Sequence, residues 1–320
     1  MDNHSERRYL ISIDGGGTKT GVCAFDRADN SVNCTVGGGG NYKTHGIEAV
    51  RDRIHNCLRE LLPDAPDISS ETEFLVMGLS GCDSPHDIEV YTDLIRSLGF
   101  SSERTLICND SEMIFRSQFD APGISIVAGT GTIALAFQTD GSVFRSGGWG
   151  APISDEGSGY WIGAEIVRKY LNWIDGAGEY NTFFSRFPEK LQCDSDEEAA
   201  AVLAAMNPSE IAEWAMPVFD SAAENSLCLR IIEEASEKTA ALAASVFRKA
   251  GFPAGEELIV AESGSLFKND LYESSFRKSL YRKLPEGKYR FHQSDGIPAE
   301  DGIRLAMKMA DKVVTTQSGD

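Results

Sequence analysis

Residues 9–25 read YLISIDGGGTKTGVCAF, two apolar segments joined by a glycine-rich turn. Tyr9–Ile13 and Gly21–Phe25 have the composition of short β-strands. Glycine has no Cβ, so Gly15, Gly16 and Gly17 would let backbone N–H groups approach phosphate oxygens closely, with Thr18 adding a hydroxyl. Asp14, at the end of the first strand, is suited to hold a hydrated Mg²⁺ ion through water. We therefore predict a hairpin with a phosphate-binding turn, although a plain glycine turn would have a similar sequence.

The same pattern returns later in the chain. Apolar segments at Ile124–Ala128 and Ile133–Phe137 flank Gly129-Thr130-Gly131-Thr132. Sliding one segment onto the other matches Gly17 with Gly129, Thr18 with Thr130 and Thr20 with Thr132. The position of the match within two strand–turn–strand units favours an internal duplication over chance. The second turn is then a second candidate for binding phosphate.

Strands alternate with helices along the chain, which predicts an α/β fold. Helical spacing occurs in Gly46–Leu62 and Asp87–Leu98, and Glu73–Leu79 and Thr105–Cys108 are apolar strands. Further patterns predict helix across Asp196–Ala250, a strand at Glu257–Ala261 and a last helix at Asp301–Val313. We expect two domains, one of residues 1–115 with a carboxyl-terminal helix within 298–320, and one of residues 116–297.

Composition excludes several classes of protein. The formal net charge of −19 and a pI near 4.7 disfavour nucleic acid and anionic membranes as partners. The polar amino end has no apolar run typical of a secretory signal, and no transmembrane-length apolar stretch occurs. The seven cysteines are scattered without a C-x-x-C pair, so we expect reduced thiols in a cytoplasmic protein. The oligomeric state stays open, with a homodimer among the options.

Polar residues after the predicted strands are candidates for chemistry. Asn109-Asp110 ends an apolar strand, where a carboxylate can accept the proton of an attacking hydroxyl. The local sequence equally fits Asp110 as a helix cap. Gly147-Gly148-Trp149-Gly150 and the polar run Ser154–Tyr160 are suited to recognise a hydroxyl-rich ring, or form a surface loop capped by Asp155 or Ser158. Asn41, after four glycines, is a sugar-binding amide or an ordinary loop residue.

Taken in order, these motifs resemble the N-acetylglucosamine kinases and the related BadF/BadG/BcrA/BcrD-type ATPases. The series runs D-G-G-G-T, G-N, N-D, G-T-G-T, G-G-W-G with D-E-G-S-G-Y-W-I-G, and a late S-G-S-L. The resemblance implies two ribonuclease H-like, actin-like ATPase domains flanking an ATP cleft. It also implies roles for individual residues: phosphate or ATP binding by Gly15, Gly16, Gly17, Thr18, Lys19, Gly129, Thr130, Gly131, Thr132, Gly264 and Ser265; sugar binding by Asn41, Asp110, Gly147, Gly148, Trp149 and Asp155; and catalysis by Asp110.

The implied activity is ATP- and Mg²⁺-dependent phosphorylation of an amino sugar, N-acetylglucosamine at its 6-hydroxyl first, with glucosamine and N-acetylmuramic acid as other acceptors. A rival interpretation is an energy-coupling ATPase that acts on a partner protein, and a third is a sugar sensor without catalysis. Electron-transfer activators of this fold hold an iron–sulfur cluster through cysteines, and the sequence has no suitably placed cysteine motif.

Overall fold

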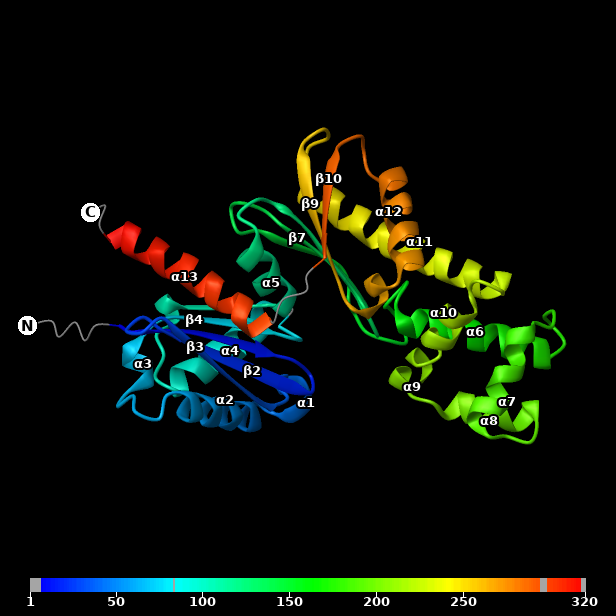
Figure 1. The fold of residues 1–320 in the computed structure, drawn as a ribbon, viewed down its shortest axis with the longest axis horizontal. Coiled ribbons are helices and arrows are strands. Elements are labelled where there is room, and N and C mark those ends of the chain that lie inside the picture. The colour runs from blue at the N-terminus through cyan, green and yellow to red at the C-terminus, as the bar shows by residue number, and fades with distance from the viewer. Residues whose placement is uncertain (1–6, 83, 294–297, 318–320) are drawn as a thin grey trace, which may run out of the picture. The chain divides into compact units, whose positions relative to one another are not determined.

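The computed structural model describes residues 7–82, 84–293 and 298–317. The chain divides into two compact units, residues 1–120 with 295–320 and residues 121–294. Each unit contains one five-stranded sheet with helices (Figure 1), which confirms the predicted α/β class. The domain boundary predicted between residues 297 and 298 falls at the edge of a stretch that lies outside the described residues.

The sheet of the first unit has the order β3-β2-β1-β4-β5, antiparallel among β1, β2 and β3 and parallel from β1 through β4 to β5. The strands are β1 (Tyr9–Gly15), β2 (Lys19–Asp26), β3 (Ser31–Gly38), β4 (Thr72–Leu79) and β5 (Thr105–Cys108). The helices are α1 (Tyr42–His45), α2 (Ile47–Leu61), α3 (Ile68–Glu71), α4 (Pro85–Ser97), η1 (Ser102–Arg104), α5 (Asp110–Gln118) and α13 (Pro298–Gln317).

Alternation along β1 divides the core of this unit between the two faces of the sheet. Ile11 and Ile13 pack with the buried residues of α2 and α4, whereas Leu10 packs with α5 and α13. An ideal Cβ on Gly302 would lie 1.8 Å from Ser12 Oγ, so glycine lets α13 approach β1 closely. The carboxyl ends of β1, β4 and β5 are thereby held at one edge of the sheet.

The second unit has the sheet order β10-β9-β6-β7-β8, with β6, β7 and β8 antiparallel and β6, β9 and β10 parallel. The strands are β6 (Gly123–Ala128), β7 (Thr132–Phe137), β8 (Val143–Gly147), β9 (Glu257–Ser263) and β10 (Lys288–Gln293). The helices are α6 (Gly159–Ile174), η2 (Thr182–Ser185), α7 (Arg186–Leu191), α8 (Asp196–Ala205), α9 (Pro208–Ala212), α10 (Ala215–Ser221), α11 (Ser226–Ala250), η3 (Ser265–Lys268) and α12 (Asp270–Lys283).

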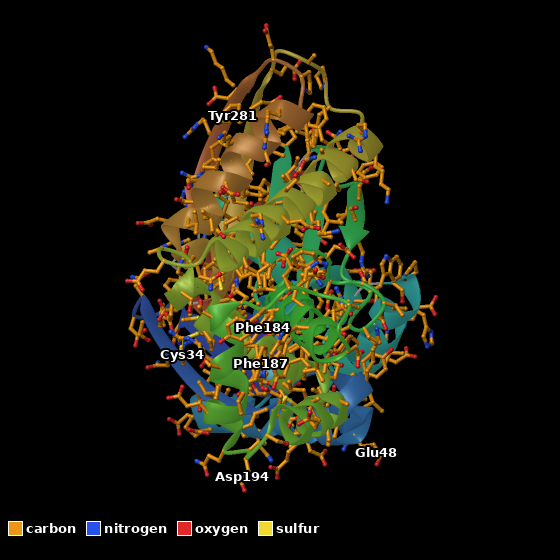
Figure 2. All side chains as sticks on the ribbon, turned by 90° about the vertical axis from the view of Figure 1, so that its right-hand side faces the viewer. Cys34, Glu48, Phe184, Phe187, Asp194 and Tyr281 are labelled. Atoms are coloured by element: carbon orange, nitrogen blue, oxygen red, sulfur yellow. A yellow bond between two sulfur atoms is a disulfide. The ribbon has the colours of Figure 1, made fainter. Side chains whose placement is uncertain are left out.

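Aromatic packing joins the helices of the second unit. The ring centroids of Tyr170 and Phe187 are 4.3 Å apart, those of Phe187 and Trp214 4.4 Å, and those of Tyr170 and Phe184 5.7 Å. Figure 2 labels Phe184 and Phe187 within this cluster. Side-chain oxygens begin many of the helices, and Ser158, one of the two predicted caps, caps α6.

Both sheets have the same topology: a three-stranded antiparallel meander from one hairpin, then two parallel strands beside its first strand. The two glycine turns occupy equivalent places, between β1 and β2 and between β6 and β7. A duplicated unit would give this arrangement. The sequence analysis did not predict the third meander strands, β3 and β8, or the edge strand β10.

The expectation that all cysteines are reduced thiols is wrong for Cys23 and Cys34, which form a disulfide. The register of β2 and β3 sets these two residues directly opposite one another, and Cys34 lies on the edge strand (Figure 2). The pairing follows from β3, which the sequence analysis missed. The other five cysteines form no disulfide.

Candidate functional site

The first glycine turn is held tightly at Gly15 and is open at Gly17. An ideal Cβ on Gly15 would lie 2.6 Å from Leu79 Cδ2 and 3.5 Å from the Cα atom of Gly40, whereas nothing lies within 4 Å of one on Gly17. Ser80 N donates to Gly15 O at 2.8 Å, and Gly40 N donates to Gly16 O at 2.8 Å. Packing thus explains the glycine at 15, while the space beside Gly17 is available to a ligand.

His45 of α1 contacts the first glycine turn, while Arg53 of α2 and Thr20 of β2 contact the loop that follows β3, beside the turn. His45 Nε2 lies 2.7 Å from Gly17 O, which requires the ring nitrogen to donate, and Arg53 Nη1 donates to Gly39 O at 2.5 Å. Thr20 Oγ1 donates to Gly38 O at 2.7 Å. Sequence reasoning missed His45 and Arg53, since their partners are backbone carbonyls that no side-chain motif reveals.

Asp14 and Asp110 are close enough to affect one another. The pKa of Asp14 is raised to about 6, first by burial and then by the negative charge of Asp110, against the opposing charge of Lys19. Asp14 is the next-to-last residue of β1, and Asp110 follows β5 as the first residue of α5. Asn109 is the residue that caps α5, accepting from Ser111 N at 3.0 Å. Asn109 is therefore the N-cap, while Asp110 Oδ1 also accepts from Ser111 N, at 2.8 Å.

These groups fit a hydrated cation with a phosphate chain. Among the described residues, no group of three or more His, Cys, Asp or Glu residues is arranged to hold a metal. Mg²⁺ at nucleotide sites keeps several waters and takes one or two carboxylates plus phosphate oxygens. A cation near Asp14 would also relieve the repulsion that raises its pKa.

Asn41 lies beside the first turn and caps α1. Its Oδ1 accepts from Lys43 N at 2.9 Å. Its side-chain amide packs on Gly81, where an ideal Cβ would lie 2.7 Å from Asn41 Nδ2. One of its polar atoms is thus already engaged with the backbone.

In the second unit, the glycine turn between β6 and β7 contacts the first residues of α6. Gly159 N donates to Gly129 O at 2.7 Å, and Tyr160 N donates to Thr130 O at 3.1 Å. An ideal Cβ on Gly129 would lie 3.7 Å from Ser265 Oγ. The turn thus lies beside Gly264-Ser265.

Gly264 requires glycine for two reasons. Its φ is +98°, and an ideal Cβ would lie 2.3 Å from Ala128 O. The end of β9 can therefore pack directly on the end of β6.

Asp155 links the second turn to the Gly147–Gly150 loop. Asp155 is 8% exposed, and its carboxylate accepts from Thr132 N at 3.4 Å. Burial raises its pKa, while hydrogen bonds from the N–H groups of Thr132, Gly150 and Ala151 oppose the rise. An ideal Cβ on Gly131 would lie 2.9 Å from Asp155 Oδ2. The observed contacts of Asp155 are with the backbone.

Arg145 shapes the Gly147–Gly150 loop and was also missed by sequence reasoning. Its Nε donates to Gly147 O at 3.0 Å and its Nη2 donates to Gly148 O. Its guanidinium lies 4.3 Å from the ring centroid of Trp149, which is 72% exposed. Gly147, Gly148 and Gly150 all have positive φ, so the loop depends on its glycines.

The predicted site residues therefore form two groups, one on each unit. Asp14 to Lys19, Asn41 and Asp110 belong to the first unit. The residues of the second glycine turn, the Trp149 loop, Asp155 and Gly264-Ser265 belong to the second unit.

A comparison with protein families identifies the chain. Residues 11–297 match the model of the BadF/BadG/BcrA/BcrD ATPase family. The chain belongs to this family. The resemblance stated from the glycine and N-D motifs is thereby confirmed, and the use of ATP follows for this BadF-family chain.

Curated relatives carry sugar kinase names. The chain is 28% identical over 287 residues to N-acetylmuramic acid/N-acetylglucosamine kinase of Clostridium acetobutylicum, covering 88% of this chain and 93% of that protein. It is 30% identical over 201 residues to N-acetyl-D-glucosamine kinase of Dictyostelium discoideum, covering 60% of this chain and 63% of that protein.

Solved structures of the same fold confirm the predicted fold class. A candidate N-acetylglucosamine kinase from Chromobacterium violaceum is 23% identical with a TM-score of 0.68, covering 93% of this chain and 99% of that one. A ROK hexokinase from Thermus thermophilus is 14% identical with a TM-score of 0.57, covering 96% and 99%. Within the described residues, no helix is long and apolar enough to cross a membrane.

We predict that Gly17→Val and Gly129→Val weaken Mg-ATP binding while the fold persists. Each position accepts a Cβ without a clash with protein atoms, at ordinary contact distance from Ser265 in the case of Gly129, so the larger side chain should interfere mainly with phosphate oxygens. Loss of one hydrogen bond to a charged group weakens binding about tenfold to a hundredfold. Calorimetry measures the affinity, and the thermal midpoint reports the fold. Gly15→Ala is the contrasting variant, since its Cβ would meet Leu79. Unchanged affinity in a folded variant would make that turn purely structural.

We predict that Asp14→Asn stabilises the ligand-free protein at neutral pH. The folded-state pKa of Asp14, about 6, lies above its ordinary value of 3.8. Asp14 therefore binds its proton more strongly in the folded state, and its contribution to stability declines as pH rises from about 4 to 6. Removing the charge should raise the free energy of unfolding at pH 7.5 by at most about 3 kcal/mol, and the gain should vanish near pH 4. Urea unfolding at both pH values measures this. An equal change in the free energy of unfolding at pH 7.5 and pH 4 would contradict the raised pKa of Asp14.

Proposed function

We propose that this chain transfers the γ-phosphoryl group of ATP to an amino sugar, N-acetylglucosamine at its 6-hydroxyl above others. The observation that carries the proposal is the carboxylate pair of Asp14 and Asp110 beside an open glycine turn. One carboxylate can position a hydrated cation while the other accepts a proton, which is the division of labour that phosphoryl transfer needs. The names of the curated relatives supply the class of acceptor.

The proposed roles follow from the chemistry of each group. Backbone N–H groups within Gly15–Thr18 and Gly129–Thr132 donate to the phosphate oxygens of ATP, and Lys19 adds a positive charge. The N–H groups of Gly16, Gly129 and Thr132 are excepted, because they already donate to Lys19 O, Gly131 O and the Asp155 carboxylate. Gly264 and Ser265 contact its adenosine side. Mg²⁺, held by Asp14 through water, would neutralise charge on the phosphates. Asp110 accepts the proton of the sugar hydroxyl as it attacks.

Recognition of the sugar is proposed for Asn41 and for the Gly147, Gly148, Trp149 and Asp155 group. Trp149 supplies an exposed aromatic face, the kind of surface on which a sugar ring packs. Asp155 and Arg145 act on this surface mainly through the loop backbone that they hold. We assign Arg145 as a positioning residue.

We predict that N-acetylglucosamine or a close relative strongly stimulates ADP production. The measurement is ADP release with N-acetylglucosamine, N-acetylmuramic acid, glucosamine, glucose and no sugar, with the phosphorylated carbon identified by ³¹P NMR. 6-Deoxy-N-acetylglucosamine is the matched control, because it keeps the ring but lacks the accepting hydroxyl. Equal ADP release with and without every sugar would support an energy-coupling ATPase instead.

We predict that Asp110→Asn lowers kcat by roughly 10²–10⁴-fold with ATP binding nearly intact, because the amide cannot accept the proton. The fold should persist, since Asn109 remains to cap α5. Asp270→Asn is the matched control, because Asn269-Asp270 begins α12 with the same Asn-Asp sequence and Asn269 as its cap. Near-normal turnover in a folded Asp110→Asn variant would remove Asp110 from the mechanism.

A further inference from the structure

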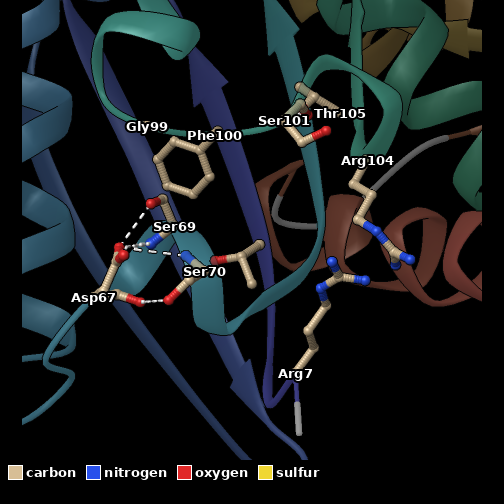
Figure 3. Close-up of a pocket in the computed structure, with 10 residues that line it drawn as sticks. Arg7, Asp67, Ser69, Ser70, Gly99, Phe100, Ser101, Arg104 and Thr105 are labelled. Atoms are coloured by element: carbon tan, nitrogen blue, oxygen red, sulfur yellow. Dashed lines mark hydrogen bonds between the residues drawn. The ribbon is translucent and has the colours of Figure 1, made fainter. Parts of the chain in front are cut away.

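A second concave site lies in the first unit, away from the glycine turn (Figure 3). It has a volume of about 380 Å³, within the usual range for small-molecule sites. It is lined by Arg7, Asp67, Ser69, Ser70, Thr72, Gly99, Phe100, Ser101, Arg104 and Thr105. We refer to it as the Arg7–Arg104 pocket.

The pocket lies at the opposite edge of the sheet from Asp14 and Asp110. Thr72 and Thr105 are the first residues of β4 and β5, and Arg7 precedes β1. Asp14 and Asp110 lie instead at the carboxyl ends of β1 and β5. Eight residues of β4 span roughly 25 Å, so the pocket is not part of that site.

Two arginines face each other on one wall of the pocket (Figure 3). The pKa of Arg104 is lowered by burial and then by the positive charge of Arg7. Arg104 Nη1 makes a long contact of 3.4 Å with Glu73 O, while the Glu73 carboxylate is paired with Arg27. Among the described residues, no carboxylate lies within ion-pair distance of Arg7. The two like charges are brought together without a carboxylate shared between them.

The one acidic side chain in the lining is already satisfied. Asp67 Oδ1 accepts from Ser69 Oγ at 2.7 Å, Ser69 N at 3.1 Å and Ser70 N at 3.3 Å (Figure 3). These hydrogen bonds hold the pKa of Asp67 below its ordinary value, with the Ser69 hydroxyl contributing most. Asp67 thus shapes the wall of the pocket and keeps its oxygens turned to its own loop.

Ser101 offers a further donor on the arginine side. Its Oγ accepts from Glu103 N at 3.3 Å, and within the described chain its own hydroxyl hydrogen has no acceptor. Thr105 Oγ1 donates to Ser101 O at 2.8 Å, which fixes the segment in place. Two guanidinium groups and one hydroxyl therefore provide donors around the same space.

We propose that the Arg7–Arg104 pocket binds a phosphate group, either inorganic phosphate or the phosphate of a phosphomonoester. Guanidinium groups match the oxygens of phosphate in paired hydrogen bonds, and a doubly charged anion offsets the repulsion between two arginines. The net charge of −19 makes the chain as a whole unattractive to anions, so a locally basic pocket stands out from its surroundings.

The test is titration of the full-length protein with inorganic phosphate, monitored by calorimetry in the presence of saturating Mg²⁺ and AMPPNP. The nucleotide analogue occupies the proposed phosphate-binding turns, so remaining saturable binding reports another site. We expect Arg7→Gln, Arg104→Gln and Ser101→Ala each to weaken it, the two arginine variants by roughly tenfold or more. Higher salt should weaken binding further.

Arg96→Gln is the matched control. Arg96 is a nearby arginine on α4 that pairs with Asp93 at 3.5 Å and does not line the pocket. It should leave phosphate affinity unchanged. Arg7 is exposed, so Arg7→Gln keeps the test valid even if Arg104→Gln impairs folding.

The source of the phosphate is resolved by repeating the titration with N-acetylglucosamine 6-phosphate. Only the binding that Arg7→Gln removes is assigned to the pocket. Tighter Arg7-dependent binding of the sugar phosphate would identify a phosphomonoester site, and equal or weaker binding would identify a site for free phosphate. No saturable phosphate binding, or binding that Arg7→Gln and Arg104→Gln leave intact, would overturn the proposal.

Discussion

The burial of the Asp14 carboxylate near Asp110 is the constraint on which the candidate site of the first unit depends. Burial and a neighbouring negative charge raise the pKa of Asp14 to about 6, so the ionised pair is costly in the absence of a cation. The sheet enforces the pair, because β1 and β5 run parallel in the same sheet and end at the same edge. Gly302 contributes from a distance by letting α13 press against β1. A buried, ionised carboxylate lowers the stability of the ligand-free fold, and such a loss is expected at a site that binds a cation.

The two units share one sheet topology, but different contacts hold the glycine turn of each. The first turn is fixed by backbone contacts with Gly40 and Ser80 and by the His45 side chain. The second is fixed by the first N–H groups of α6 and by the Asp155 carboxylate. The same hairpin can therefore be held in place by different neighbouring residues. The two segments thus share a glycine at Gly17 and Gly129 and differ in the residues that hold the turns.

The sequence predicted those parts of the fold whose signal is local. Strands β1, β4 and β5 are apolar runs, and both glycine turns follow directly from their residues. The edge strands β3 and β10 are largely exposed, and the sequence analysis overlooked their short alternation of apolar residues, which are Val32, Cys34 and Val36 in β3 and Tyr289 and Phe291 in β10. Missing β3 also concealed the Cys23–Cys34 disulfide, which depends on register alone.

Side chains that act through tertiary contacts were beyond local reasoning. Asn109-Asp110 and Asn269-Asp270 begin helices with the same two residues, and in each case the asparagine caps the helix. What distinguishes them is that Asp110 lies near Asp14, a fact of sheet order rather than of sequence. Arg145 donates to a backbone carbonyl at the end of β8, and His45 donates to one in the first glycine turn. Their roles therefore depend on the folded position of those carbonyls, which the local sequence does not reveal.

The contacts of Arg145 also refine how the Trp149 loop would meet a sugar. The carbonyl oxygens of Gly147 and Gly148 already accept hydrogen bonds from the Arg145 guanidinium. The main role of the two glycines would therefore be to position Trp149, and not to accept hydrogen bonds from the sugar. Asp155 is 8% exposed and directed at backbone N–H groups. Of the residues proposed to bind sugar on this unit, Trp149 therefore has the largest free surface. Discrimination among amino sugars would then depend on the shape of one aromatic face and on the rigidity of the loop that Arg145 and Asp155 hold beneath it.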